Sequence, residues 1–277
     1  MSNDRSILIT GCSSGIGLCA ARGLKARGYR VFATARKAAD VAALAAEGFE
    51  ALRLDLADSG SIREAVEEVL RRTEGRLYAL FNNGAFGQPG AVEDLSREVL
   101  REQFETNLFG THELTTLVIP TMRRQGQGRI LQNSSLLGFV AMPFRGAYNA
   151  SKYALEGLTD TLRLELAGSG VYVSLIEPGP IESRFRANAY ELYRRNIAAE
   201  HSVHRERYRA MEERLRKEGA AARFTLGPEA VLKRVLHALE AERPKPRYPV
   251  TFPAYLFATL RRVLPTRTLD AILGRIE

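Results

Sequence analysis

The sequence predicts a single α/β domain with a doubly wound parallel sheet of the Rossmann type. Short runs rich in strand-forming residues alternate with segments whose apolar residues recur at helical spacing. Strands that alternate with helices in this way form a parallel sheet with helices on both faces, because the crossovers are nearly always right-handed. The length of 277 residues, with 45% hydrophobic and 26% charged residues, excludes collagen, low-complexity disorder and coiled-coil rods.

Six strands are expected in the first two thirds of the chain. They cover residues 6–10, 29–35, 51–54, 77–81, 128–134 and 171–176. Two helix starts are also visible: Ser61 and Glu64 have the spacing of a capping box, and Pro228 and Glu229 suit the first turn of a later helix. The strand pattern stops near residue 180, where a charged helical segment begins. We interpret that segment as an insertion over the sheet.

The positive charge of the chain is concentrated in this segment. The chain has 40 Lys and Arg against 32 Asp and Glu, a net charge of +8. Eleven of the cations lie between Arg184 and Arg223, together with six glutamates. Because glutamates interleave with the arginines, we interpret the segment as a solvated helix face and expect no nucleic-acid partner. An anionic substrate, an acidic partner or a nucleic acid is the alternative for the same arginines.

The cysteines and the N-terminal residues indicate the compartment. Cys12 and Cys19 have neither the number nor the spacing of a disulfide framework or a zinc site. The apolar run at residues 7–9 is too short for a signal peptide, and no apolar stretch of about 18 residues follows it. We therefore expect a cytoplasmic protein with free thiols and no bound metal.

A glycine-rich turn follows the first expected strand. Gly11, Gly15 and Gly17 have the spacing G-x-x-x-G-x-G, directly before a predicted helix. Glycines at such a turn let a pyrophosphate approach the backbone, and the helix N-terminus then offers free N–H groups. The pattern therefore predicts a dinucleotide site. The alternative is an ordinary glycine-rich connection between a strand and a helix.

The end of the second strand indicates which dinucleotide would bind. An NAD-binding fold carries an acidic residue there, which bonds the ribose 2′-hydroxyl. This chain has Ala35 at that place, followed by Arg36 and Lys37. A guanidinium pairs with a 2′-phosphate, so NADP(H) is favoured over NAD(H). The alternative is that both cations are only solvated loop charges.

Two further patterns suggest acid–base chemistry. Tyr148 and Lys152 are four residues apart at the start of a predicted helix, so they share one face. An ammonium group beside a phenol lowers the pKa of the phenol, and this would suit Tyr148 to proton transfer. Ser135 follows the fifth strand at the edge where open α/β sheets bind ligands. Taken separately, the first pair could be a surface pair, and the serine a helix cap.

Together these motifs resemble those of the short-chain dehydrogenase/reductase family. The resemblance covers about residues 5–185 and rests on residues 10–17, Asp55, Asn82-Asn83-Gly84, Asn107, Ser135, Tyr148-x-x-x-Lys152 and Pro178-Gly179. Residues 222–229 and 245–251 look closest to bacterial NADP-dependent aldehyde reductases of that family. One departure is visible, because the family's Asn-Asn-Ala-Gly reads Asn82-Asn83-Gly84-Ala85 here. Ala85 tolerates a positive φ less well than glycine, so the local loop geometry is open.

The resemblance implies a role for each matched residue. Tyr148 would be the acid–base group, Lys152 would lower its pKa and bond the nicotinamide ribose, Ser135 would polarise the substrate oxygen, and Asn107 would hold a relay water. Asp55 would contact adenine, and Asn82 would line the cofactor cleft. The complete set expected to bind the cofactor is Thr10, Gly11, Ser13, Ser14, Gly15, Ile16, Gly17, Arg36, Lys37, Asp55, Leu56, Asn82, Asn83, Gly84, Tyr148, Lys152, Pro178, Gly179, Ile181 and Ser183.

The resemblance also implies an activity and an organisation for residues 1–277. We expect an NADP(H)-dependent oxidoreductase that reduces a hydrophobic aldehyde or ketone by hydride transfer. Oxidation or reduction of a hydroxysteroid, a retinoid or another lipid-like alcohol is one alternative, and a non-catalytic NADP(H)-binding sensor is another. The core would cover about residues 5–182, a substrate-covering segment about 183–226, and a C-terminal helix and tail about 227–277. A homodimer or homotetramer is implied.

Two apolar regions bear on the substrate. The side chains expected to wall the cleft are Leu136, Leu137, Phe139, Met142, Phe144, Phe185, Tyr190 and Tyr193, and ordinary core packing is the alternative for each of them. Residues 248–264 form a basic amphipathic stretch. Such a stretch is compatible with a membrane surface, a subunit interface or a seal on the substrate pocket, and these alternatives stay open.

Overall fold

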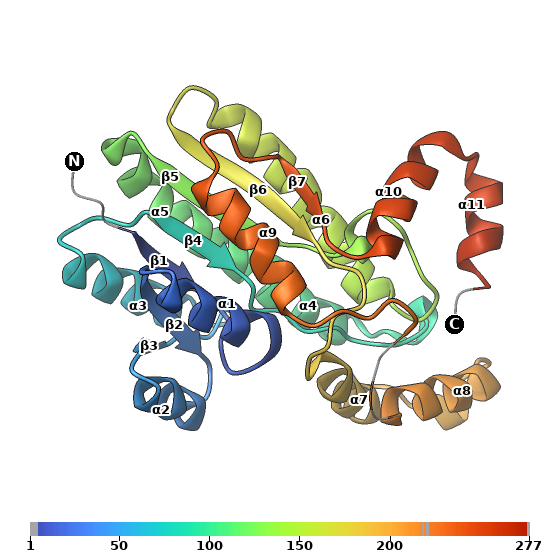
Figure 1. The fold of residues 1–277 in the computed structure, drawn as a ribbon. Helices are drawn as coiled ribbons and strands as arrows, with labels where there is room; N and C mark the ends of the chain where they lie inside the picture. Colours follow the sequence, from blue (N-terminus) through green and yellow to red (C-terminus); the bar gives the residue numbers. More distant parts are fainter. Residues whose placement is uncertain (1–4, 218, 220–221, 276–277) are drawn as a thin grey trace.

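The computed structural model describes residues 5–217, 219 and 222–275. The expected N-terminus, three positions of the covering segment and the last two residues of the tail therefore lie outside the described residues. The described chain contains a parallel sheet in the order β3-β2-β1-β4-β5-β6-β7 (Figure 1). Its strands are β1 (Ser6–Ile9), β2 (Arg30–Ala35), β3 (Glu50–Arg53), β4 (Ala79–Asn82), β5 (Gly128–Asn133), β6 (Val171–Glu177) and β7 (Arg247–Pro249). The predicted Rossmann-type sheet is confirmed, and its order reverses between β1 and β4, where such sheets bind ligands.

Helices cover both faces of the sheet, and the alternation of side chains along each strand supplies both packing surfaces. One face packs on α1 (Gly15–Ala26), α2 (Ala38–Ala46) and α9 (Glu229–Glu240), and the other on α3 (Ser59–Arg72), α5 (Thr111–Gln125) and α6 (Gly146–Glu165). In β1, Ile7 and Ile9 join the first core and Leu8 joins the second. This period of two is the reason that fully buried strands read as continuous apolar runs.

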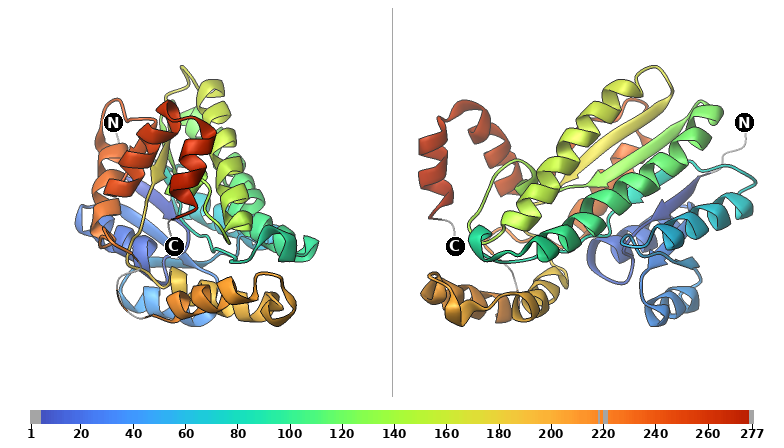
Figure 2. Two further views of the ribbon diagram at one scale, coloured as in Figure 1. Left: turned by 90° about the vertical axis from the view of Figure 1, so that its right-hand side faces the viewer. Right: turned by 180° about the vertical axis from the view of Figure 1, so that it is seen from behind.

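A helical cover lies beyond the carboxyl ends of the strands (Figures 1 and 2). It consists of α7 (Phe185–Asn196), the short turn η4 (Ala199–His201) and α8 (Arg205–Arg216). A parallel bridge between Ile181 and Leu226 joins the start and the end of this segment. Tyr208 is 1% exposed at the centre of a small apolar core between cover and domain, and its hydroxyl donates to Asp94 over 2.7 Å. The cover is therefore packed onto the sheet domain at the edge where the site is expected.

Three expectations about the elements are wrong. A seventh strand, β7, pairs in parallel with β6, although the strand pattern was expected to stop near residue 180. It has three residues and contains a proline, so it is too short to show a period. Helix α3 begins at Ser59, and Asp58 is its cap through a bond from the Ser61 N–H. Ser61 is thus inside the helix and forms no capping box. Pro228 is the cap residue of α9 and not part of its first turn, whereas Glu229 begins the helix as expected.

The remaining elements connect the strands to the site. They are η1 (Val92–Asp94), α4 (Arg97–Phe104), the π-helical turn η2 (Glu105–Gly110) and the short turn η3 (Leu136–Gly138).

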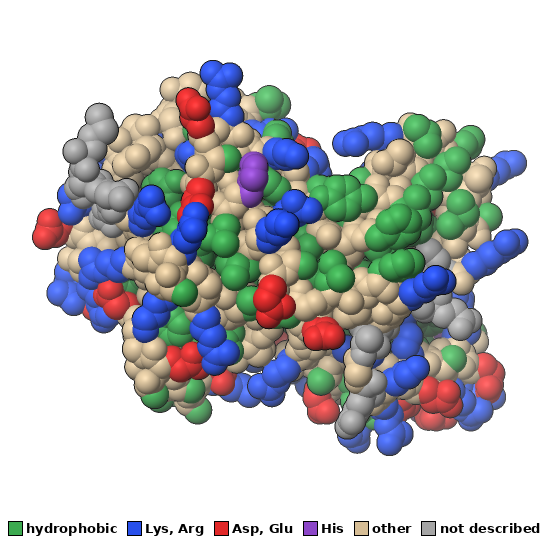
Figure 3. Space-filling view, viewed as in Figure 1, with side chains coloured by type: hydrophobic (Ala, Val, Ile, Leu, Met, Phe, Trp, Pro, Cys, Tyr) green, Lys and Arg blue, Asp and Glu red, His purple; other side chains and the backbone are tan. Residues whose placement is uncertain are grey.

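The C-terminal helices α10 (Phe252–Val263) and α11 (Thr266–Leu273) lie against the segment after β5. Phe257 and Leu273 pack on apolar residues of that segment, such as Phe139. Other hydrophobic side chains gather on the surface over α10 (Figure 3), with Phe252 57% and Val263 66% exposed. Contact with a membrane or a second subunit stays a prediction. None of the described helices is both long and apolar enough to cross a membrane.

Candidate active site

Tyr148, Lys152 and Ser135 converge at the carboxyl end of β5. Helix α6 begins at Gly146, so its first turn carries Tyr148 and its second carries Lys152. The Lys152 side chain is 2% exposed, and its Nζ donates to the backbone oxygen of Asn133 over 2.6 Å. The same Nζ lies 5.7 Å from the centre of the Tyr148 ring. Ser135 caps the short turn η3, and its hydroxyl lies close enough to Tyr148 to lower the pKa of the phenol. The three expected groups are thus brought together.

The protonation of Tyr148 differs from the expectation. Burial raises the pKa of Tyr148 to about 12, and the hydrogen bond with Ser135 opposes this without overcoming it. Burial also lowers the pKa of Lys152 to about 8, while Glu156 raises it. The expected lowering of the Tyr148 pKa is therefore not found for the protein groups alone, because desolvation dominates and only Ser135 opposes it. The phenol is protonated at neutral pH, as a proton donor must be.

Asn107 supports this group from the π-helical turn η2. Its side chain is 1% exposed and exchanges two hydrogen bonds with the backbone of Phe86, at 2.9 and 3.1 Å. It also donates to Ser151 over 3.2 Å, and the Ser151 hydroxyl donates to the backbone oxygen of Tyr148 over 2.9 Å. Single π-helical turns are frequent at functional sites. The structure thus gives Asn107 a positioning contact to α6, while its relay water stays a prediction.

The glycine-rich turn between β1 and α1 has the shape of an anion cradle. Gly11 and Gly15 have φ values of 70° and 55°, which L-residues rarely adopt. A Cβ on Gly17 would lie 2.2 Å from the Gly11 oxygen, so the turn admits no side chain there. Ser14 caps α1 without a side-chain bond, and the first helical turn carries no acidic residue. The turn therefore fits the pyrophosphate of a dinucleotide.

Asn83 and Thr10 hold the turn in this shape. The Asn83 amide donates to the backbone oxygens of Thr10 and Gly11, at 2.9 and 3.2 Å, and accepts from Asn133 over 2.9 Å. The Thr10 hydroxyl accepts from the N–H groups of Asn83 and Gly84, at 2.9 and 2.8 Å. A hydrogen-bonded path therefore runs from the turn through Asn83 and Asn133 to Lys152.

The exchanged pair Gly84-Ala85 is accommodated without strain. Among the described residues, the non-glycine positions with positive φ are Glu74, Phe144 and Phe224, so Ala85 is not one of them. Gly84 lies against the turn, where a Cβ on Gly11 would be 2.8 Å from its Cα. Glycine is thus present at position 84, where the segment after β4 comes closest to the glycine-rich turn.

The other residues expected to contact the cofactor differ in how exposed they are and in which groups they bond. Arg36 and Lys37 are exposed at the end of β2. Asp55 accepts from the N–H of Ala57 over 3.1 Å in a local turn. Asn82 is 4% exposed and donates to Thr115 on α5 over 2.8 Å, so its amide faces α5 while Asn83 contacts the turn.

The remaining residues expected to bind the cofactor lie in the glycine-rich turn, after β3 and after β6. Ser13, Ser14 and Ile16 belong to the turn and the start of α1, and Leu56 follows β3. Pro178, Gly179, Ile181 and Ser183 follow β6. A Cβ on Gly15 would lie 3.0 Å from the Cβ of Ser183, so this segment reaches the glycine-rich turn.

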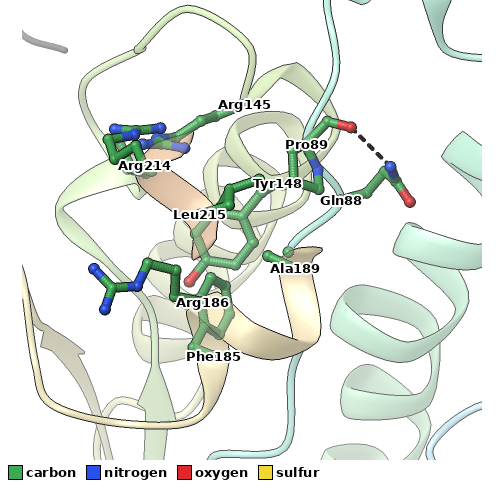
Figure 4. A pocket seen from close by; sticks show the side chains of 11 residues that line it. Gln88, Pro89, Arg145, Tyr148, Phe185, Arg186, Ala189, Arg214 and Leu215 are labelled. Atoms are coloured by element: carbon green, nitrogen blue, oxygen red, sulfur yellow. Dashed lines mark hydrogen bonds between the residues drawn. The ribbon is translucent and has the colours of Figure 1, made fainter. Parts of the chain in front are cut away.

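A cavity of about 160 Å³ opens at Tyr148 between the sheet domain and the cover (Figure 4). Its lining residues are Gly87, Gln88, Pro89, Leu137, Arg145, Tyr148, Phe185, Arg186, Ala189, Arg214 and Leu215. The Phe185 ring packs edge-on against the Tyr148 ring, with centres 5.2 Å apart. Of the apolar side chains expected to wall the cleft, only Leu137 and Phe185 are among these described lining residues. Leu136, Phe139 and Met142 pack near α10 and α11 instead, and Phe144, Tyr190 and Tyr193 pack in the core of the cover.

Comparison with known proteins decides the family. Residues 5–193 match the short chain dehydrogenase family. The chain is 45% identical to the uncharacterized oxidoreductase YbbO of Escherichia coli K12 over 98% of this chain and 94% of that protein. The chain belongs to the short-chain dehydrogenase family.

Two further relatives bear on the cofactor of this family member. It is 32% identical to the NADPH-dependent 3-dehydrocapnine reductase of Ornithobacterium rhinotracheale, covering 97% of this chain and 95% of that protein. A short-chain dehydrogenase/reductase of Burkholderia phymatum, solved in complex with NAD, superposes with a TM-score of 0.76 at 26% identity, covering 97% and 94% of the two chains. The names of these two proteins thus include NADPH for one and NAD for the other, so both nicotinamide cofactors occur among the proteins that resemble this chain. The expectation of an oxidoreductase acting on alcohol and carbonyl groups is confirmed by the family.

Sequence reasoning missed several residues of this short-chain dehydrogenase site. Asn133 binds Lys152 through its backbone and Asn83 through its side chain. Its place directly before Ser134-Ser135, at the end of β5, was an available signal. Ser151 lies inside the Tyr-x-x-x-Lys motif, where nothing in the pattern distinguishes it. Arg145 lies three residues before Tyr148, but only the fold shows that both line the cavity.

Proposed function

We propose that the protein is an NADP(H)-dependent carbonyl reductase in which Tyr148 gives the proton to the carbonyl oxygen. The observation that carries this proposal is the convergence of protonated Tyr148, Ser135 and buried Lys152, where Tyr148 lines a cavity and Asn133 and Asn83 connect Lys152 to the glycine-rich turn. Residues 10–17 and 178–183 would hold NADPH, which would supply a hydride for the carbonyl carbon. The products are then the alcohol and NADP⁺, with the phenolate of Tyr148 regaining a proton from solvent.

The protein side chains act on the oxygen of the substrate. Ser135 would donate to it and fix its position, because its hydroxyl already lies against that of Tyr148. The Lys152 cation, almost sealed from water, would stabilise the phenolate that proton donation leaves behind. Asn107 would keep the start of α6 in register through Ser151. A donor aimed at developing charge contributes about 10²–10³ in rate.

The preference for NADP(H) rests on the end of β2. Ala35 is 3% exposed, and Arg36 and Lys37 project into solvent just beyond it. In the described part of the chain, neither cation has an acidic partner within ion-pair distance, so both are available for a 2′-phosphate. The printed name of the NADPH-dependent relative supports the same preference.

The cavity favours a small carbonyl compound over a lipid. Its volume of about 160 Å³ is similar to that of an engineered cavity of about 150 Å³ that holds benzene. An aliphatic aldehyde or ketone of modest length suits this space, and the aldehyde-reductase resemblance supports it.

The test of the proposed function is Tyr148→Phe, assayed with NADPH on aliphatic aldehydes and ketones. We expect turnover to fall by at least about 10²-fold while NADPH affinity is retained, because the phenyl ring keeps the packing against Phe185. Tyr172→Phe is the matched control, since Tyr172 is 40% exposed on β6. Wild-type turnover in Tyr148→Phe would contradict the mechanism.

We also propose that residues 1–277 form one domain that assembles as a homodimer or homotetramer in the cytoplasm. Light scattering and cell fractionation test the assembly and the location. A monomer at micromolar concentration would contradict the first.

A further inference from the structure

The cavity at Tyr148 contains a cation that the proposed mechanism does not use. Arg145 is the N-cap residue of α6 and lies three residues before Tyr148, so the two side chains leave the helix on one face. It is partly buried and lines the same cavity as Tyr148. Figure 4 shows the guanidinium groups of Arg145 and Arg214 together at one end of the cavity, with the Tyr148 ring beyond them.

The surroundings of Arg145 are unfavourable to a positive charge. The N-terminus of a helix is its positive end, and α6 has 20 residues. Burial lowers the pKa of Arg145 to about 10, and the neighbouring Arg214 adds to this effect. Within residues 5–217, 219 and 222–275, the guanidinium of Arg145 has no hydrogen bond or ion pair. The lining residues also include Arg186 and no Asp or Glu among those the structure describes.

Another arginine of this chain shows how a structural cation is held. Arg247 on β7 is also partly buried, with 29% of its side chain exposed, and it pairs with Glu156, Glu177 and Asp160. Arg145 has no such carboxylate among the described residues. A buried charge is retained only where a partner offsets its desolvation. For Arg145, the cavity leaves room for that partner to come with a ligand.

We propose that the substrate of this enzyme carries a carboxylate, which pairs with Arg145 while the carbonyl group faces Tyr148. This rests on the proposed carbonyl reductase activity and narrows its substrate class to oxo acids with a short aliphatic chain. The apolar lining residues Pro89, Leu137 and Leu215 would contact that chain. A guanidinium forms paired hydrogen bonds with a carboxylate or a phosphate, and the carboxylate is the smaller of these two anions.

Matched substrates test this proposal. Adipic semialdehyde, its methyl ester and hexanal share the reacting aldehyde and differ in the distal charge. With saturating NADPH, we expect kcat/KM for the acid to exceed that for the methyl ester by about 10- to 100-fold, the range of one charge-assisted pair. Equal values for the acid and its ester would overturn the proposal while leaving the reductase activity intact.

Variants of Arg145 provide the second arm. Arg145→Gln is expected to reduce the ratio of kcat/KM for acid over ester to near one, and Arg145→Lys to retain part of it. Arg209→Gln, on the exposed face of α8, is the matched control and should leave the ratio unchanged. A ratio that survives in Arg145→Gln would overturn the assignment.

A binding measurement separates this inference from the activity. Hexanoate has the carboxylate but no aldehyde or ketone group. Its binding to the protein in the presence of NADP⁺ can therefore be measured by calorimetry without any turnover. We expect binding by the wild type and weakening of roughly 10-fold or more in Arg145→Gln. If no aldehyde is reduced but this difference is found, the proposed reaction fails and the anion site stands. If hexanoate binds both proteins equally, the anion site fails.

Discussion

Replacing Asn83 by alanine should loosen the glycine-rich turn and weaken cofactor binding together. The Asn83 side chain makes three hydrogen bonds, at 2.9 and 3.2 Å to backbone oxygens of the turn and at 2.9 Å from Asn133. Each such bond contributes about 1 kcal/mol, so the loss is about 2–3 kcal/mol of unfolding free energy when partial exposure is allowed for. Asn83→Asp should cost more, because its carboxylate would face the oxygens of Thr10 and Gly11.

The free energy of unfolding is measured by urea denaturation, and NADP⁺ affinity by calorimetry. If half of the lost energy bears on the shape of the turn, Kd for NADP⁺ rises roughly tenfold, since about 1.4 kcal/mol corresponds to a factor of ten. Asn196→Ala is the matched control, because its amide, at the end of α7 in the cover, donates to Gln88 of the sheet domain over 2.7 Å, away from the turn. A stability loss below about 0.5 kcal/mol with unchanged Kd would refute the reasoning.

Three other predictions concern Arg36, Arg247 and Lys152. Arg36→Asp should weaken the binding of NADPH at least tenfold and that of NADH little, because it replaces a cation at the exposed end of β2 by an anion. Equal losses of affinity for both cofactors in calorimetry would contradict the assignment. Arg247→Met should lower the free energy of unfolding by about 3–5 kcal/mol in urea denaturation, because it leaves Glu156 and Glu177, of which Glu177 is 2% exposed, without their cation. Arg71→Gln, at an exposed ion pair, is the control and should change it little. Similar losses in the two variants would argue against a buried network. Carbonyl reduction should decline as pH rises through about 8, where burial places the Lys152 pKa: the cation exists below that pH, and Tyr148, with a pKa of about 12, stays protonated throughout. A flat profile of kcat/KM up to pH about 10 would show that the Lys152 charge is not needed.

Local patterns predicted the parts of the fold that local physics determines. Buried strands such as β1 carry apolar residues on both faces, and the glycines of the turn are required by backbone geometry, so both are visible in the sequence. Tyr148 and Lys152 share a helix face because of their spacing alone. The strand β7 escaped notice, because a three-residue strand with a proline acquires its pairing only from β6.

The parts of the site that depend on distant contacts could not be predicted. Spacing suggested that Lys152 would lower the pKa of Tyr148, but the sequence does not contain the burial that reverses this effect. The wall of the cavity depends on how α7 and α8 pack, so Phe185 lines it while Tyr193 joins the core of the cover. Arg145 and Arg214 meet only because the cover folds back over the start of α6.

The bridge that joins the two ends of the cover has an evolutionary consequence. Glu182 donates to Leu226 over 2.9 Å, and Leu226 donates back to Pro180 over 3.2 Å, so the segment leaves and rejoins the sheet domain at one rung. A lineage can therefore lengthen, shorten or exchange this segment without shifting any strand. Such a change would alter the cavity residues that α7 and α8 contribute, while Ser135, Tyr148 and Lys152 would keep their places on the sheet domain.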